Sequence, residues 1–174
     1  KALAEGPDGE PTFYQHEAIS ERLAVKILTR LKFPKDTERA VCHLIKNHMF
    51  FYEENWTDAA VRRFITRVGK DTIGDLFLLR MADQFGMAGR PVLSGNLDMF
   101  RRRIDAIIES DSIFTLKDLA VGGNELHEEA GIPKGPVMGT VLTFLFEAVL
   151  DDPSQNTKEK LIELARNFYQ QRLV

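Results

Sequence analysis

The sequence has little cysteine and no long apolar run, and both absences limit what the protein can be. Its only cysteine, Cys42, excludes an internal disulfide framework and a cysteine-rich zinc site. The longest apolar stretch, Val141 to Leu150, is interrupted by polar residues and is far shorter than the roughly 20 residues of a membrane-spanning helix. We therefore expect a cytoplasmic protein without membrane association, in which this stretch forms a buried helix.

Composition and charge exclude further classes. Hydrophobic residues make up 44% of the chain and charged residues 28%, which excludes a disordered or collagen-like protein. The 174 residues, with a net charge of -3, are enough for one domain, or for one domain and a small second unit. The chain begins at Lys1 without a signal-peptide pattern, as expected for a piece of a longer protein.

Common catalytic and nucleotide-binding motifs do not occur. The sequence contains no GxxxxGK loop, no GxGxxG and no Ser, His and Asp arrangement typical of nucleophilic catalysis. Motifs alone therefore assign no catalytic residue.

Apolar residues recur with helical spacing along most of the chain, and no segment alternates with a period of two. The first helix is expected from His16 until Pro34 stops it, with an inward stripe of Ile19, Leu23, Ile27 and Leu31. Further helices are expected from about residue 36, over 58–69, from 71 towards 86, after 91, as two short helices over 116–130, and over 136–150 and 157–172. The predicted fold is an all-α multi-helix bundle with a smaller helical C-terminal extension.

Composition also predicts how the chain is divided. Residues 1–12 are rich in proline and glycine and are expected to form a flexible N-terminal segment. Glycines cluster after residues 111–115, so we expect a helical domain over 13–112 and a helical tail over 113–174. Asp58 and Asn156 are predicted to be helix N-caps.

Three polar side chains occupy positions where the helical pattern requires apolar ones. His16, His48 and Asp83 each lie three or four residues from an apolar stripe residue, on three different expected helices. Imidazole and carboxylate groups ligate divalent ions, so the three residues are candidates for part of a metal or phosphate site. The alternative is that each lies near a helix end and is satisfied by hydrogen bonds or water.

Positive charge is concentrated in the expected helix over 58–69. Arg63, Arg67 and Lys70 follow each other at i, i+4 and i+7, with Arg62 beside them. Like charges four residues apart destabilise a helix by roughly 0.2–0.5 kcal/mol per pair, so an anion nearby would stabilise the row. That anion is either a nucleic-acid phosphate or a set of neighbouring acids.

A glycine-rich stretch from Gly131 to Gly139 indicates a second anion site. Gly135 and Pro136 are expected to open a helix whose first amide groups have no partner within the helix, and such an end attracts anions. Lys134 directly precedes it, so Lys134 and Gly135 are candidate phosphate contacts. The alternative is close helix packing without a ligand.

Several segments, taken in order, carry a family resemblance. They are FYQHE at 13–17, LIKNH at 44–48, AD at 82–83, AVGGNEL at 120–126, GIPKGPVMG at 131–139 and DDPSQNT at 151–157. In this order they resemble the C-terminal part of the CCA-adding enzyme and poly(A) polymerase family of tRNA nucleotidyltransferases, from about residue 13 to 164.

The resemblance implies an HD-type helical domain in which His16, His48 and Asp83 correspond to later positions of the HD metal-site pattern. The earlier histidine and the His-Asp doublet of that pattern would lie before Lys1, so half of the ligand set is present and only weak binding of a divalent metal is expected. Nucleotidyl transfer in the family uses carboxylates of an N-terminal catalytic head that hold two Mg²⁺ ions. These residues supply no such head, so the chain alone is expected to be inactive in nucleotide transfer.

Three functions remain as hypotheses. In the first, the chain positions tRNA, or another RNA backbone, for the absent head of a protein that adds CCA, part of CCA or poly(A). Its phosphate contacts would be Arg62, Arg63, Arg67, Lys70, Lys134 and Gly135. The second is an HD-type metal-dependent phosphohydrolase acting on nucleotides or phosphodiesters, and the third is a non-catalytic helical scaffold.

Overall fold

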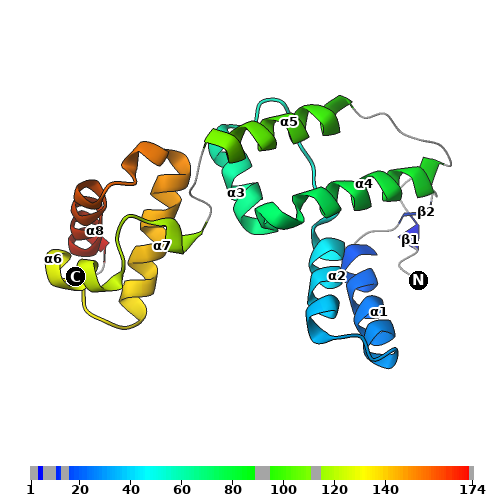
Figure 1. The fold of residues 1–174 in the computed structure, drawn as a ribbon, viewed down its shortest axis with the longest axis horizontal. Coiled ribbons are helices and arrows are strands. Elements are labelled where there is room, and N and C mark those ends of the chain that lie inside the picture. The colour runs from blue at the N-terminus through cyan, green and yellow to red at the C-terminus, as the bar shows by residue number, and fades with distance from the viewer. Residues whose placement is uncertain (1–3, 6–10, 13–15, 89–94, 111–114, 173–174) are drawn as a thin grey trace. The chain divides into compact units, whose positions relative to one another are not determined.

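The structure is a computed structural model that describes residues 4–5, 11–12, 16–88, 95–110 and 115–172 (Figure 1). Within these residues it contains eight α-helices, three short 3₁₀ helices and one antiparallel pair of two-residue strands, β1 (Ala4–Glu5) and β2 (Pro11–Thr12). The predicted all-α class is confirmed. None of the helices described is both long enough and apolar enough to cross a membrane.

The chain divides into two compact units by packing. The first comprises Lys1–Glu53 and Lys70–Asp98, and the second comprises Glu54–Gly69 and Met99–Val174. This division differs from the boundary expected near residue 112, because the segment around residues 54–69 packs with the C-terminal helices. Residues 111–114, where that boundary was expected, and residues 13–15 of the FYQHE segment lie outside the described residues.

The first unit is built around a helical hairpin. Helices α1 (His16–Arg30) and α2 (Lys35–Asn47) pack against each other, and α2 also packs against α4 (Ile73–Ala88), which follows the 3₁₀ helix η1 (Lys70–Thr72). The hairpin turn is closed by a 3.0 Å hydrogen bond from the Phe33 N–H to the Leu28 carbonyl. After α2, the ring of Phe50 lies 5.2 Å from the ring of Phe77 in α4, which ties the following loop to this helix.

The predicted inward stripe of α1 is wrong at three of its four positions, and only Ile19 is half-buried. The helix has no buried residue, and Leu23, Ile27 and Leu31 are 52%, 47% and 57% exposed. The half-buried positions of α1 include Ala24 and Leu28 instead. Periodic spacing shows that residues share one face of a helix, but it does not show that another element covers that face.

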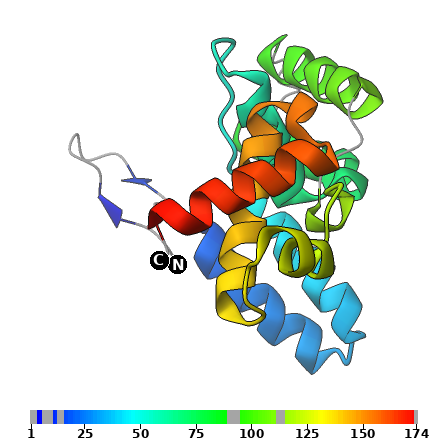
Figure 2. The same cartoon turned by 90° about the vertical axis from the view of Figure 1, so that its left-hand side faces the viewer.

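The second unit is organised around α7 (Pro136–Asp151). This helix contacts α3 (Asp58–Val68), η2 (Leu116–Asp118), α6 (Gly123–Ala130), η3 (Pro153–Gln155) and α8 (Lys158–Arg172). Residues 99–110 of α5 (Gly95–Ser110) belong to the same unit. Figure 2 shows α8 lying across α7. The buried-helix prediction for residues 141–150 is confirmed, since α7 buries Met138, Val141, Leu145, Phe146, Val149 and Leu150.

The predicted cap of α3 is displaced by one residue. Thr57, not Asp58, is the N-cap, and its hydroxyl accepts a hydrogen bond from the Ala60 N–H. The Asp58 carboxylate lies 2.6 Å from the guanidinium of Arg103 in α5 instead. Both residue types favour this position, and the ion pair with another helix decides between them.

Asn156 does not cap α8, contrary to the prediction. Its side-chain oxygen accepts a hydrogen bond of 2.8 Å from the Ala120 N–H, and its amide donates one of 3.0 Å to the Asp118 carbonyl. The side chain therefore ties the loop before α8 to the end of η2, which is a contact across 36 to 38 positions of sequence.

Phe100 is the clearest test of packing in the second unit. It is fully buried, and its ring lies 4.9 Å from that of Phe64 and 5.7 Å from that of Trp56. We expect Phe100→Ala to lower the free energy of unfolding by about 3–5 kcal/mol, through lost burial and the remaining cavity. Urea unfolding measures this. The neighbouring Met99, 41% exposed, is the control: Met99→Ala should change stability by less than about 0.5 kcal/mol, and equal losses would contradict the packing described.

Candidate functional site

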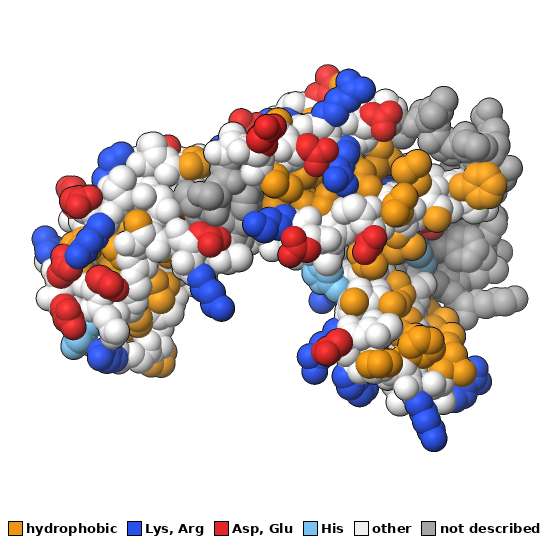
Figure 3. All heavy atoms as spheres, in the orientation of Figure 1, with side chains coloured by type: hydrophobic (Ala, Val, Ile, Leu, Met, Phe, Trp, Pro, Cys, Tyr) orange, Lys and Arg blue, Asp and Glu red, His pale blue; other side chains and the backbone are white. Residues whose placement is uncertain are grey.

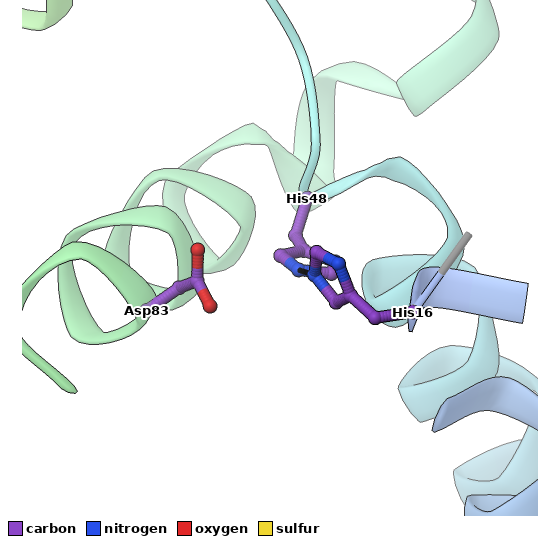
Figure 4. A group of neighbouring side chains, drawn as sticks. All are labelled: His16, His48 and Asp83. Atoms are coloured by element: carbon purple, nitrogen blue, oxygen red, sulfur yellow. Dashed lines mark hydrogen bonds between the residues drawn. The ribbon is translucent and has the colours of Figure 1, made fainter. Parts of the chain in front are cut away.

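Three elements of the first unit bring His16, His48 and Asp83 together, as the sequence pattern indicated. His16 is the first residue of α1, His48 follows the last residue of α2, and Asp83 lies in the second half of α4. Figure 4 shows the Asp83 carboxylate pointing from α4 toward the two imidazole rings. One ligand atom from each side chain lies within 4.8 Å of the others.

The two imidazoles are in direct contact. The His16 Nε2 and His48 Nε2 atoms are 3.2 Å apart, and the ring planes meet edge to face at 66°. His48 is the one buried polar residue among those described, at 6% exposure, whereas His16 and Asp83 are half-buried. The site therefore has a buried inner side at His48 and an accessible outer side.

A backbone hydrogen bond orients His48. Its Nδ1 lies 2.5 Å from the Ile45 carbonyl oxygen, one turn back in α2. A carbonyl only accepts, so His48 Nδ1 carries the proton and the Nε2 lone pair is directed at His16. The same arrangement, with one ring nitrogen held by a carbonyl, is how proteins prepare the other nitrogen for a metal ion.

Arg80 was not identified from the sequence, yet it borders the site. Its guanidinium lies 3.4 Å from the Asp83 carboxylate and 3.1 Å from the Met49 sulfur. Residues 80 and 83 share a face of α4, so the spacing i, i+3 carried the signal. The pair holds the Asp83 carboxylate in place.

The donor set fits a divalent transition metal. Two ligand atoms on a tetrahedral zinc ion with bonds of about 2.0–2.1 Å are separated by about 3.3 Å, close to the Nε2–Nε2 separation found here. Two imidazoles and one carboxylate are a common ligand set for such ions. A small inward movement of Asp83 would complete three contacts.

The cations of α3 are used in two different ways. Arg62 donates a 3.2 Å hydrogen bond to the Leu150 carbonyl. Arg63 pairs with Glu147 at 2.8 Å and with Asp151 at 2.9 Å, and these hydrogen bonds raise the pKa of Arg63 above its ordinary value. Both arginines thus meet the C-terminal end of α7, where a cation is favoured by the helix dipole and by carbonyls without helical partners.

Arg67 and Lys70 have no acidic partner within the described residues. The Arg67 guanidinium lies 5.4 Å from the centre of the Phe64 ring and is exposed. Lys70 is exposed and opens η1, which belongs to the first unit.

The start of α7 has the form that the sequence predicted. Gly135 precedes the helix with a φ of 125°, a conformation that favours glycine, and Pro136 is at its first position. No side chain caps the first amide groups, and the first turn contains no acid. Lys134 is exposed beside this end. The positive partial charge of this helix end is therefore not neutralised by a side-chain cap or by an acid of the first turn.

Comparison with known proteins agrees with the sequence resemblance. Residues 12–165 match the family described as tRNA nucleotidyltransferase domain 2. The chain is 31% identical to an A-adding tRNA nucleotidyltransferase of Deinococcus radiodurans over 154 residues, 85% of this chain and 34% of that protein. It is 36% identical to a CCA-adding enzyme of a Geobacillus strain over 75 residues, 42% of this chain and 19% of that protein.

The chain therefore spans about a third of the first relative and about a fifth of the second. No solved structure matches it significantly. The resemblance to the CCA-adding family is confirmed by the family match, which covers both units.

The tautomer of His48 tests the geometry of the site. In the neutral imidazole of His48 we expect the proton on Nδ1, because the Ile45 carbonyl accepts a hydrogen bond from this nitrogen. Long-range ¹H–¹⁵N NMR spectra distinguish the two nitrogens. A proton on His48 Nε2 in the absence of metal would contradict this arrangement, and Ala in place of His16 should leave the His48 tautomer unchanged.

Proposed function

Because the chain belongs to the tRNA nucleotidyltransferase domain 2 family, we propose that it is the helical region that positions tRNA for nucleotide addition. The transfer step itself would belong to a catalytic head with two Mg²⁺ ions, outside these 174 residues. The observation that carries the proposal is the family match over residues 12–165. One relative is named an A-adding tRNA nucleotidyltransferase and the other a CCA-adding enzyme, and the first name supports tRNA as the substrate.

The proposed RNA contacts are cations that have no acidic partner in the described parts of the chain. Arg67, Lys70 and Lys134, with the α7 amide groups after Gly135, would contact backbone phosphates. Arg62 and Arg63 would hold α3 against α7 within the second unit. Phosphate contacts fix the position of a nucleic acid without reading its sequence.

The exposed apolar residues support a second part of the proposal, namely that the first unit packs against the catalytic head. Of twelve large hydrophobic side chains that are exposed in the described residues, ten belong to the first unit, which leaves its apolar surface incompletely covered. They include Leu78, Met81 and Phe85, which lie along α4. Both relatives have most of their length outside the matched region, so they contain enough chain to cover such a surface.

Charge reversal tests the proposed tRNA contacts. We expect Arg67→Glu with Lys134→Glu to weaken tRNA binding at least about tenfold at low salt, and to reduce the slope of log K against log salt by about 2, because each phosphate contact contributes about 1. Fluorescence anisotropy with labelled tRNA at several salt concentrations measures both. Arg102→Glu with Lys117→Glu changes the net charge equally on exposed positions of α5 and η2 and should have little effect. Unchanged binding by the first variant would refute these contacts.

A metal-dependent function is the second candidate, and the grouping of His16, His48 and Asp83 favours it. When bound there, a divalent ion would supply Lewis-acid polarisation of a phosphate oxygen or activation of a water molecule. His16 and His48 would bind through Nε2 and Asp83 through its carboxylate. The chemistry would be hydrolysis of a nucleotide or phosphodiester, as in an HD-type phosphohydrolase.

Cobalt binding tests this candidate. Visible absorption should show about one Co²⁺ per chain, bound weakly by the wild type and not measurably by His48→Ala. Removing a hydrogen-bond partner of a metal-binding side chain lowers metal affinity about 10–100-fold, so removing a metal-binding side chain itself should lower it further. His127→Ala is the control, because His127 lies in α6 and bonds the Ile132 carbonyl. Equal Co²⁺ binding by the His48 and His127 variants would exclude the site, and phosphatase activity that follows Co²⁺ content would favour the hydrolase.

A further inference from the structure

A second row of cations lies on α1, and the function proposed above makes no use of it. Arg22, Lys26 and Arg30 follow each other at i, i+4 and i+8. All three side chains are exposed. Within the described part of the chain none of them has an ion pair or a hydrogen bond. Figure 3 shows Lys and Arg side chains around the hairpin of α1 and α2.

The α1 row differs from the α3 row in its surroundings. In α3, Glu147 and Asp151 neutralise Arg63. In α1 the nearest acid along the chain is Glu21, which lines a shallow surface hollow with Arg22, Val25 and Lys26 but forms no ion pair with them. Like charges four residues apart destabilise a helix, so a row of three that forms no ion pair within the described residues would be stabilised by an external anion.

The row also has a definite shape. Successive positions are about 6 Å apart along the helix axis and turn by about 40° around it, so the three form a slowly winding row about 12 Å long. A linear ligand with regularly repeated negative charge would contact all three at once. A nucleic-acid backbone has that form, whereas a protein partner would have to present three acids at matching positions.

We infer that Arg22, Lys26 and Arg30 bind consecutive backbone phosphates of an RNA strand. This inference rests on the proposed function, because it takes tRNA as the ligand, and it adds a contact surface on the first unit. The exposed apolar row of Leu23, Ile27 and Leu31 lies about 100° around the helix and would be left to the catalytic head. The two rows would thus place bound RNA beside the surface against which the head packs.

Neutralising the row tests the inference with the full chain and unmodified tRNA. The variant carries Arg22→Gln, Lys26→Gln and Arg30→Gln. It should bind tRNA roughly tenfold or more weakly at low salt, with the slope of log K against log salt reduced by about 3. The control carries Lys46→Gln, Arg102→Gln and Lys117→Gln, which removes the same charge from exposed residues elsewhere, and it should keep most of the slope. Circular dichroism checks that both variants fold.

The outcomes separate the inference from the function on which it rests. If the wild type does not bind tRNA even at low salt, the proposed function fails. If the wild type binds but the α1 variant keeps its affinity and slope, this inference alone is overturned. A third variant, Ile27→Ser with Leu31→Ser, leaves the charge unchanged and should keep tRNA binding. If it loses binding as strongly as the charge variant, the face binds through its apolar row and the phosphate assignment is wrong.

Discussion

The second unit depends on the burial of α7. Six apolar side chains of this one helix are buried, and α3, α6, α8 and two 3₁₀ helices all contact it. The opposite face of the helix is exposed and carries Thr140, Thr143 and Glu147, and both ends of the helix are polar. The C-terminal end is met by Arg62 and Arg63 of α3, and the N-terminal end begins at Gly135 beside Lys134. The basic residues at the two ends of α7 therefore differ in role. Arg62 and Arg63 at the C-terminal end hold the unit together, and Lys134 at the N-terminal end is exposed and available to an anion.

The polar centre of the first unit is the group of His16, His48 and Asp83. His48 is buried at the junction of α2 with the following loop, and its bond to the Ile45 carbonyl directs the other nitrogen toward His16. Asp83 is held from the other side by Arg80. A histidine pair this close, next to a carboxylate, is an arrangement that a divalent ion would stabilise, because each side chain then gives up little freedom to bind it.

The two units differ in how completely they are covered. The core of the second unit is closed within the chain, whereas the first unit exposes apolar residues of α1 and α4. An incompletely covered unit gains stability from a partner that buries these residues, at about 25 cal/mol per Å² of apolar surface removed from water. The chain matches about a third or less of each relative's length, so the relatives contain further chain that could cover this apolar surface. A partner that covers the apolar row of α1 would leave the neighbouring row of cations on the same helix exposed.

The sequence by itself determined the all-α class, most of the helix positions, the grouping of His16, His48 and Asp83, and the family, because helical periodicity, terminal glycines and short motifs are local signals. The tertiary structure alone decided which faces are covered and which charges are neutralised. Leu23, Ile27 and Leu31 have core spacing but are exposed among the residues that the structure describes, and Asn156 has capping chemistry but bonds Ala120 and Asp118. Arg63 of α3 and Lys26 of α1 belong to rows of similar spacing, yet only Arg63 has acids opposite it. Burial and ion pairing depend on residues far away in the sequence, and a local pattern contains no information about them.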